Sequence, residues 1–256
     1  MNLYLDNSVV NWLLRNGEDR FKQAMHSTHV PIIGEYVVLE AGATPYEARR
    51  EALFSIINSL GIDIVLCNPF DMVKNTVTAM AKGESEVNIQ TRSNGALILI
   101  TKPLLSKQDY VQQECEARRN ELHSTFNAAT IGATESLNKE YTKESWVRYG
   151  WIDFLKKMFQ DGESPKWLLD EIFKAAGLNL VSLDEARDLI SKEPIMTYWF
   201  VCWLRQMYES VRVVGSNNQV APGLFIDIMQ GMALAFCDMF ISHNKHQVTY
   251  IQDVVD

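Results

Sequence analysis

Short apolar runs alternate with helix-like segments over the first eighty residues. Strands are expected at 2–6, 30–33 and 62–67. Apolar residues at the three- and four-residue spacing of a helix recur over 8–15, 35–41, 44–60 and 71–82. Strands that alternate with helices predict a parallel sheet and an α/β fold.

The alternation stops in the middle of the chain. Helix patterns dominate from about residue 95 to 212. Helices are expected over 107–137, 145–159, 164–177 and 195–211, and another is expected to begin at residue 182. Residues 91–105 are apolar and fit either element. After a loop at 214–222, a helix is expected over 224–236, then strands over 239–242 and 248–251. This layout predicts a core of 1–83 plus 216–256, divided by an all-helical insertion of 84–215.

Two tetrapeptides have the pattern of a helix capping box. Thr44-Pro45-Tyr46-Glu47 and Ser182-Leu183-Asp184-Glu185 each place a hydroxyl residue three positions before a glutamate. In such a box the hydroxyl and the carboxylate each accept a backbone N–H at the helix start. Both sites are therefore predicted to begin helices.

Composition narrows the class of protein. The formal net charge is -8, which does not fit a protein that binds nucleic acid through a broad basic face. The four cysteines are scattered without a CxxC pair and are expected to be free thiols. No apolar run reaches membrane-spanning length, and no basic stretch leads into an apolar run at the start. A cytoplasmic protein with no membrane contact is expected.

Acidic residues occur where the predicted elements begin or end. Asp6 follows the first strand, Glu40 lies in the helix after the second, Asp227 opens a late helix and Asp238 precedes the strand at 239–242. The carboxyl ends of parallel strands meet at one edge of a sheet, so residues distant in sequence gather there. Carboxylate oxygens suit Mg²⁺ or Mn²⁺, which promote phosphate chemistry.

Three motifs in this order resemble the PIN domain, a family of metal-dependent nucleases. Leu5-Asp6-Asn7-Ser8 matches the first, and Val38-Leu39-Glu40 closes the second. The third runs from Asp227 through Asp238 to Ser242-His243-Asn244. The resemblance covers residues 1–83 and 220–256. Asn244 stands where the family pattern has its final acid, and the central insertion is much larger than the family's usual link.

The resemblance implies a three-layer α/β/α fold and a Mg²⁺- or Mn²⁺-dependent endoribonuclease. It implies that the metal ligands and catalytic acids are Asp6, Glu40, Asp227 and Asp238. It further implies that the substrate or the attacking water is positioned by Asn7, Ser8, Ser242 and Asn244. RNA is the expected nucleic acid rather than DNA. A homodimer is the expected assembly, and a toxin role would add a cognate antitoxin or other protein partner.

Several alternatives stay open from the sequence. A catalytically relaxed scaffold would use the helical insertion to bind protein or RNA, and a DNA-directed 5′-nuclease is a third reading. Asp227 alone reads equally well as a helix cap and Asp238 as a turn residue. Glu35 is a secondary acid candidate, and His243 with His246 is a weak zinc pair. The tryptophans of the insertion, at helical spacing, are expected to be core residues.

Overall fold

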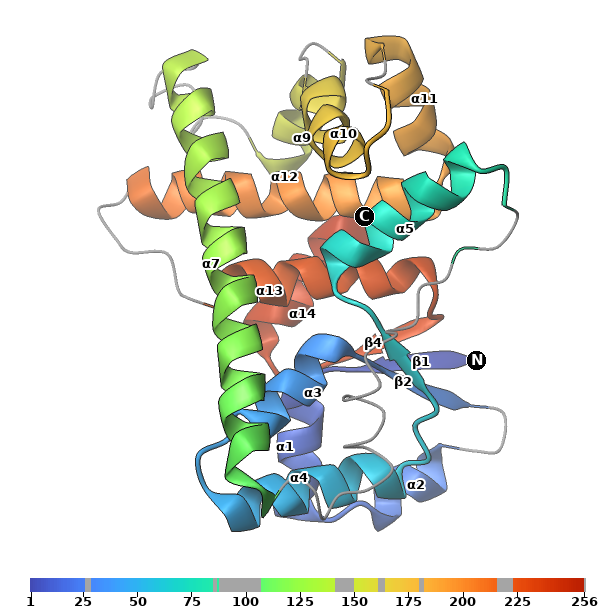
Figure 1. The fold of residues 1–256 in the computed structure, drawn as a ribbon, viewed down its shortest axis with the longest axis vertical. Helices are drawn as coiled ribbons and strands as arrows, with labels where there is room; N and C mark the ends of the chain where they lie inside the picture. Colours follow the sequence, from blue (N-terminus) through green and yellow to red (C-terminus); the bar gives the residue numbers. More distant parts are fainter. Residues whose placement is uncertain are drawn as a thin grey trace. The chain divides into compact units, whose positions relative to one another are not determined.

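The chain divides into two units, each built from separated stretches of sequence. The computed structural model describes residues 1–25, 29–84, 87, 107–140, 150–160, 164–179, 182–215 and 223–255 (Figure 1). The first unit comprises 1–68, 89–122 and 233–248. The second comprises 69–88, 123–232 and 249–256. Within the described part of the chain, no helix is both long and apolar enough to cross a membrane.

The first unit is organised by a four-stranded parallel sheet. The strands are β1 (Asn2–Leu5), β2 (Val30–Gly34), β3 (Ile64–Leu66) and β4 (Met239–Ile241), in the order β3-β2-β1-β4. Tyr4 pairs with Ile32 of β2 and with Phe240 of β4. A parallel sheet with helical connections confirms the α/β prediction.

The central strand β1 is buried on both faces. Leu3, Tyr4 and Leu5 are each at most 4% exposed, and the Tyr4 ring stacks on Phe240 with centroids 4.9 Å apart. Such burial explains why β1 reads as a continuous apolar run rather than an alternating one. Gly34, at the end of β2, gives space to the Tyr4 hydroxyl. A Cβ atom there would lie 2.5 Å from that oxygen.

The helices predicted over 8–15, 35–41 and 44–60 are present as α1 (Asn7–Asn16), α3 (Glu35–Gly42) and α4 (Glu47–Ser59). The unit also contains α2 (Asp19–Ala24), the start of α7 (Asp109–Glu140) and the start of α14 (Lys245–Val255). Helices α1, α3 and α4 pack against one another. The four cysteines of the chain are all free thiols, as expected.

The capping box predicted at residues 44–47 is wrong. Tyr46 is the N-cap of α4, and no side chain accepts a hydrogen bond there. The Thr44 hydroxyl instead donates to the backbone oxygen of Glu40. Arg50, which is buried, donates to the backbone oxygens of Thr44 and Pro45 at 3.0 and 3.1 Å. A buried guanidinium therefore fixes the turn that a hydroxyl cap was expected to fix.

Two predictions near the end of the chain also need correction. The strand expected at 248–251 is part of helix α14, because Asn244 caps its start and Gln247, Ile251 and Val254 form a buried helical stripe. The helix expected over 224–236 is shorter. It consists of α13 (Leu224–Met229) followed by a 3₁₀ turn over Gln230–Ala235.

The second unit is helical and centres on the long helix α12 (Pro194–Gly215) (Figure 1). Helix α12 contacts α13 and three other helices, which are α5 (Pro69–Ala81), α9 (Trp151–Gln160) and α11 (Leu183–Lys192). Helix α10 (Ser164–Ala175) packs on α5, α9 and α11. The Ser182 capping box is confirmed, with both of its hydrogen bonds formed. The ambiguous segment 91–105 and residues 216–222 of the predicted loop lie outside the described residues.

The division into units differs from the predicted domain boundaries. Helix α5 was assigned to the core by sequence, but it packs on α10 and α12 of the helical unit. Helix α13 and the end of α14 group with the same unit. The rings of Phe70 in α5 and Phe225 in α13 both contact the Trp203 ring of α12, so packing rather than order along the chain decides the unit of these two helices.

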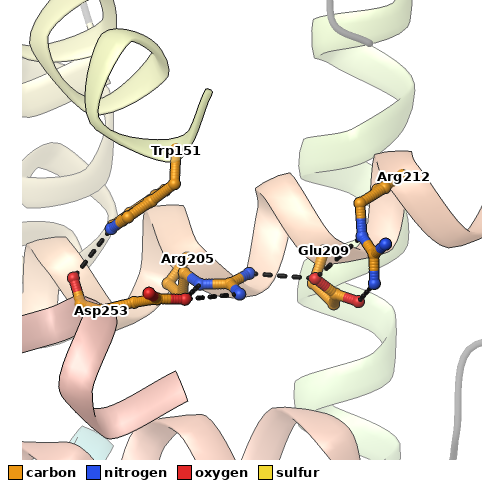
Figure 2. Close-up of polar contacts among 5 residues, drawn as sticks. All are labelled: Trp151, Arg205, Glu209, Arg212 and Asp253. Carbon is orange, nitrogen blue, oxygen red and sulfur yellow. Dashed lines mark hydrogen bonds and ion pairs between the residues drawn. The ribbon is translucent and has the colours of Figure 1, made fainter. Parts of the chain in front are cut away.

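A buried ion network ties α9, α12 and α14 together in the second unit (Figure 2). Arg205 donates to Glu209 at 3.0 Å and to the carboxylate of Asp253 at 2.8–3.0 Å. Trp151 donates its indole N–H to the backbone oxygen of Asp253. Burial alone would raise the pKa of Glu209, but its bonds to Arg212 and Arg205 outweigh burial and hold that pKa below its ordinary range.

We expect Gly34→Ala to destabilise the chain by about 1–3 kcal/mol, because overpacking a rigid site has that cost. Tyr4→Phe removes only the oxygen that the new methyl group would meet, since the ring carbons lie at 3.5 Å or more. The double variant should therefore be more stable than Gly34→Ala alone. Urea unfolding of the three variants measures this coupling, and additive effects would contradict it.

Arg205→Leu should destabilise the chain by about 3 kcal/mol, because removing one partner of a buried pair leaves charge uncompensated. Arg212→Leu is the matched control on the same carboxylate. The Arg212 side chain is 62% exposed, so its loss should cost no more than about 1 kcal/mol. Equal losses of stability in the two variants, measured by thermal unfolding, would show that the buried ion pairs contribute no more than the exposed one.

Candidate functional site

Polar residues gather where the four strands of the sheet end. Asp6 directly follows β1, Glu35 follows β2, Ser242 follows β4 and Asn68 lies two residues beyond β3. Because all four strands are parallel, these positions share the carboxyl edge of the sheet. Asp6 and Glu35 are only 4% and 7% exposed. The edge thus contains two buried carboxylates at the ends of adjacent strands.

Asp6 is held by three hydrogen bonds from within the chain. Its Oδ1 accepts the Ser8 hydroxyl at 2.6 Å and the Val9 backbone N–H at 3.1 Å. Its Oδ2 accepts the Ser242 hydroxyl at 3.0 Å. The bond from Val9 makes Asp6 the N-cap of α1, and the bond from Ser242 joins residues 236 positions apart. Asp6 is therefore both a helix cap and the link between the ends of β1 and β4.

Two serines connect Asp6 to the start of α14. Ser8 accepts the backbone N–H of His243 at 2.7 Å, and Ser242 accepts that of Asn244 at 2.9 Å. The Ser242 oxygen also lies 2.7 Å from Oε1 of Gln247, which is fully buried. A serine hydroxyl has one proton, so Ser242 can donate to Asp6 or to Gln247 but not to both at once. Protonated Asp6 would satisfy all of these oxygens.

The pKa of Asp6 reflects this environment. Burial raises the pKa, and the hydrogen bonds from Ser8, Val9 and Ser242 oppose the rise without cancelling it. The pKa of Asp6 stays above the ordinary value of 3.8 as a result. Among the described residues, no lysine, arginine or histidine forms an ion pair with Asp6 or Glu35. Within the described residues, this edge thus has two buried carboxyl groups without a basic partner.

Glu35 and Glu40 bring further carboxylates from α3. Glu35 Oε2 accepts the backbone and side-chain N–H groups of Asn68, each at 3.3 Å. Glu40 is partly exposed. Burial raises the pKa of the Tyr4 hydroxyl, and the charges of Asp6, Cys237 and Glu40 raise it further. Asp6 and Glu40 therefore both lie within electrostatic reach of Tyr4.

Three helices of the first unit begin at this edge. Asp6 caps α1, Gly34 is the N-cap of α3, and Asn244 Oδ1 accepts the N–H groups of His246 and Gln247 at the start of α14. The amino end of a helix has partial positive charge and favours anions. These ends offset part of the carboxylate charge and also favour a phosphate group.

Asp238 does not join this edge, and its predicted place beside Asp6 is wrong. It precedes β4, and Leu3 pairs with Met239, so Asp238 lies level with Asn2 at the opposite edge. Its Oδ2 accepts the Asn2 backbone N–H at 2.7 Å, and its own N–H donates to the Asn2 oxygen. Asp238 fixes the start of the β1–β4 pair, which is the turn role that its sequence also allowed.

The other predicted residues have defined surroundings. Asn7 accepts from the Asn11 side chain along the outer turn of α1. Asp227 belongs to the second unit, in the first turn of α13 after the N-cap Gly223, and its charge helps to raise the pKa of Tyr250, which burial raises most. The His243 ring stacks on Trp12.

The described residues contain no group of three or more histidine, cysteine, aspartate or glutamate side chains placed to hold a metal ion. The oxygen donors of this edge are nevertheless of the kind that Mg²⁺ takes, and magnesium sites often use one or two carboxylates completed by water and phosphate.

Sequence reasoning undervalued Glu35 and missed Gln247. Glu35 follows β2 as directly as Asp6 follows β1, and this shared position was the available signal. Gln247 had no such signal, because it directly precedes residues 248–251, which were predicted as a strand.

Because burial raises the pKa of Asp6, we expect its ionisation to destabilise the fold. The folded chain binds the Asp6 proton more tightly than the unfolded chain does. The stability of the wild type relative to Asp6→Asn should therefore fall as pH rises from 3.8 through the raised folded pKa. Urea unfolding across this range measures the difference. The exposed Asp63→Asn gives the baseline, and a wild type that gains stability relative to Asp6→Asn as pH rises would contradict the expectation.

Comparisons with models of known protein families, with curated proteins and with solved structures find no match to this chain.

Proposed function

We propose that this protein is a metal-dependent nuclease of the PIN type, which hydrolyses phosphodiester bonds in RNA. The observation that supports it best is the pair of buried carboxyl groups, Asp6 and Glu35, at adjacent strand ends with no basic partner among the described residues. Buried anions are costly unless a cation or proton compensates them. A divalent metal ion at this edge would supply that compensation.

The residues suited to hold the metal come from the sequence motifs and from the edge itself. Asp6, Glu40 and Asp227 are the ligands that the motifs supply, and Glu35 is a further carboxylate that the motifs ranked second. Asp238 is left out because it lies at the opposite edge. A bound Mg²⁺ or Mn²⁺ would activate water and neutralise charge on the phosphate.

The remaining edge residues have supporting roles in this proposal. Ser8 and Ser242 fix the orientation of the Asp6 carboxylate through bonds of 2.6 and 3.0 Å. The amino ends of α1, α3 and α14 attract the phosphate of the substrate. The choice of RNA rests on the resemblance to PIN domains. The three-layer PIN-like fold, with residues 84–215 as an insertion, belongs to the same proposal.

One observation favours a second candidate, a catalytically relaxed scaffold that binds protein or RNA. Both oxygens of Asp6 already accept hydrogen bonds from within the chain. A ligand role for Asp6 requires a lone pair that these bonds do not use, or a shift of Ser242 toward Gln247. A relaxed scaffold requires neither.

Manganese titration by calorimetry, with RNA cleavage measured on the same samples, tests the first candidate. We expect Asp6→Asn and Glu40→Gln to weaken manganese binding by about 100-fold or more, since even outer-shell partners contribute 10–100-fold. Cleavage of single-stranded RNA should be lost in both variants and in EDTA. Asp238→Asn is the matched control, because it makes the same chemical change at the other end of the β1–β4 pair.

Each outcome separates the candidates. Saturable binding and cleavage that survive in Asp238→Asn but not in Asp6→Asn establish the nuclease. Absence of manganese binding in the wild type rejects it and leaves the scaffold. Equal losses in Asp6→Asn and Asp238→Asn, with unfolding at lower urea, would mean that the effect is one of stability. Cleavage of single-stranded DNA in preference to RNA would overturn the choice of substrate.

A further inference from the structure

An exposed aromatic pair lies close to the candidate metal site, within the first unit. The Trp12 ring of α1 stacks on the His243 ring, with centroids 6.2 Å apart and an angle of 24° between the planes. Both residues are exposed, and Trp12 remains 38% exposed even with His243 against its ring. Tryptophan is on average a deeply buried residue. The pair is therefore an aromatic surface that the folded unit leaves open to solvent.

Two hydrogen bonds connect this pair to Asp6. The backbone N–H of His243 donates to the Ser8 oxygen at 2.7 Å, and the Ser8 hydroxyl donates to Asp6 at 2.6 Å. Ser8 and Trp12 are four residues apart in α1, so they lie on the same face of that helix, about 6 Å apart along its axis. The open aromatic surface is thus about one helical turn from the residue that orients the candidate metal ligand.

Two arginines add positive charge near Trp12. Arg15 is exposed in the last turn of α1, three residues after Trp12. Arg49 is also exposed, and it donates to the side-chain oxygen of Asn11 at 2.9 Å. Neither arginine forms an ion pair with a carboxylate of the described residues. Aromatic rings beside cations that the protein does not neutralise are the combination that binds single-stranded nucleic acid.

We propose that Trp12 stacks on a nucleobase of a single RNA strand, and that His243 supports the indole ring from its other side. This inference rests on the proposed function for its ligand, the RNA. The stacked base should lie within about two nucleotides of the phosphate at the metal site, because Ser8 and Trp12 are only one helical turn apart. Bases of single strands can be splayed out onto aromatic side chains, whereas a duplex keeps its bases stacked on one another. The contact therefore selects single strands over duplexes.

A cycle of changes in protein and RNA tests this contact. A short fluorescein-labelled single-stranded RNA is prepared intact and with one abasic nucleotide at each position in turn. Its binding to the full chain is measured by fluorescence anisotropy in EDTA, which stops metal-dependent cleavage. The variants are Trp12→Ala, Trp12→Phe and the matched control Trp167→Ala. Trp167 is 41% exposed, close to the value for Trp12, but it belongs to the second unit.

We expect Trp12→Ala to weaken RNA binding by about 10-fold, as for the loss of one stacked base, while Trp12→Phe keeps most of the affinity and Trp167→Ala keeps all of it. One abasic position should weaken binding to the wild type by a similar factor and should have no effect on Trp12→Ala, because the base and the ring are partners in one contact. Additive effects at every position, or an equal loss in Trp167→Ala, would overturn the proposal.

Tryptophan fluorescence gives a readout that does not need the alanine variant to fold. Stacking on a base quenches an indole, so the RNA should quench the wild type more than Trp12→Phe, which keeps an aromatic ring but has no indole at this position. Equal quenching of these two proteins would also overturn the proposal.

Manganese-dependent cleavage of the same RNA separates this inference from the proposed function. The cut should lie within about two nucleotides of the abasic-sensitive position, and a cut farther away would reject the placement of Trp12 beside the metal site. Cleavage by the wild type without any sensitive position would reject the stacking contact and keep the nuclease. A sensitive position that depends on Trp12, in a protein that does not cleave, would keep the contact and reject the nuclease. A wild type that binds no RNA, in EDTA or in manganese, would reject both.

Discussion

The pairing of β1 with β4 is the constraint on which the first unit depends. It joins residues 2–5 to residues 239–241, and two polar contacts hold its ends: Asp238 with Asn2 at one edge, and Asp6 with Ser242 at the other. Closing a loop of this length costs conformational entropy, although the cost grows only slowly with length. Burial of β1 on both faces, with β2 and β4 on either side of it, offsets that cost.

The same contact places a charge where charge is expensive. Asp6 gives one oxygen to the start of α1 and the other to Ser242, and its burial raises its pKa. A neutral residue would cap the helix at lower cost. An acid at a position that disfavours its ionised form is common at functional sites, where a ligand can relieve the unfavourable electrostatics. The proposed metal is one such ligand.

Local patterns in the sequence predicted the elements whose signals are themselves local. The strand that ends at Asp6, the helix behind it and the Ser182 capping box are all present. Predictions failed where distant residues decide the outcome. Arg50 fixes the turn that Thr44 was expected to cap, and Asn244 starts a helix over residues that alternate like a strand.

The candidate site shows the same contrast between local and long-range signals. Asp6 and Ser242 were predicted from their positions at strand ends, and they do meet. Asp238 failed because its role depends on the register of β4 against β1, and a sequence shows which residues flank a strand but not which edge they reach. The indole N–H groups of Trp199 and Trp203, which are unpaired within the described residues, were beyond prediction, since helical spacing marks a core position and does not show which acceptors lie near it.

The β1–β4 pair also sets when the sheet edge is completed during synthesis. Residues 2–5 leave the ribosome 234 positions before residue 239, and chains grow by roughly 5–20 residues per second, so β1 waits roughly 10–50 s for its partner. Throughout that interval Asp6 lacks Ser242. A nascent chain that has not yet reached residue 239 therefore exposes the apolar side of β1 without a completed edge, and the proposed metal site would stay incomplete until β4 has been made.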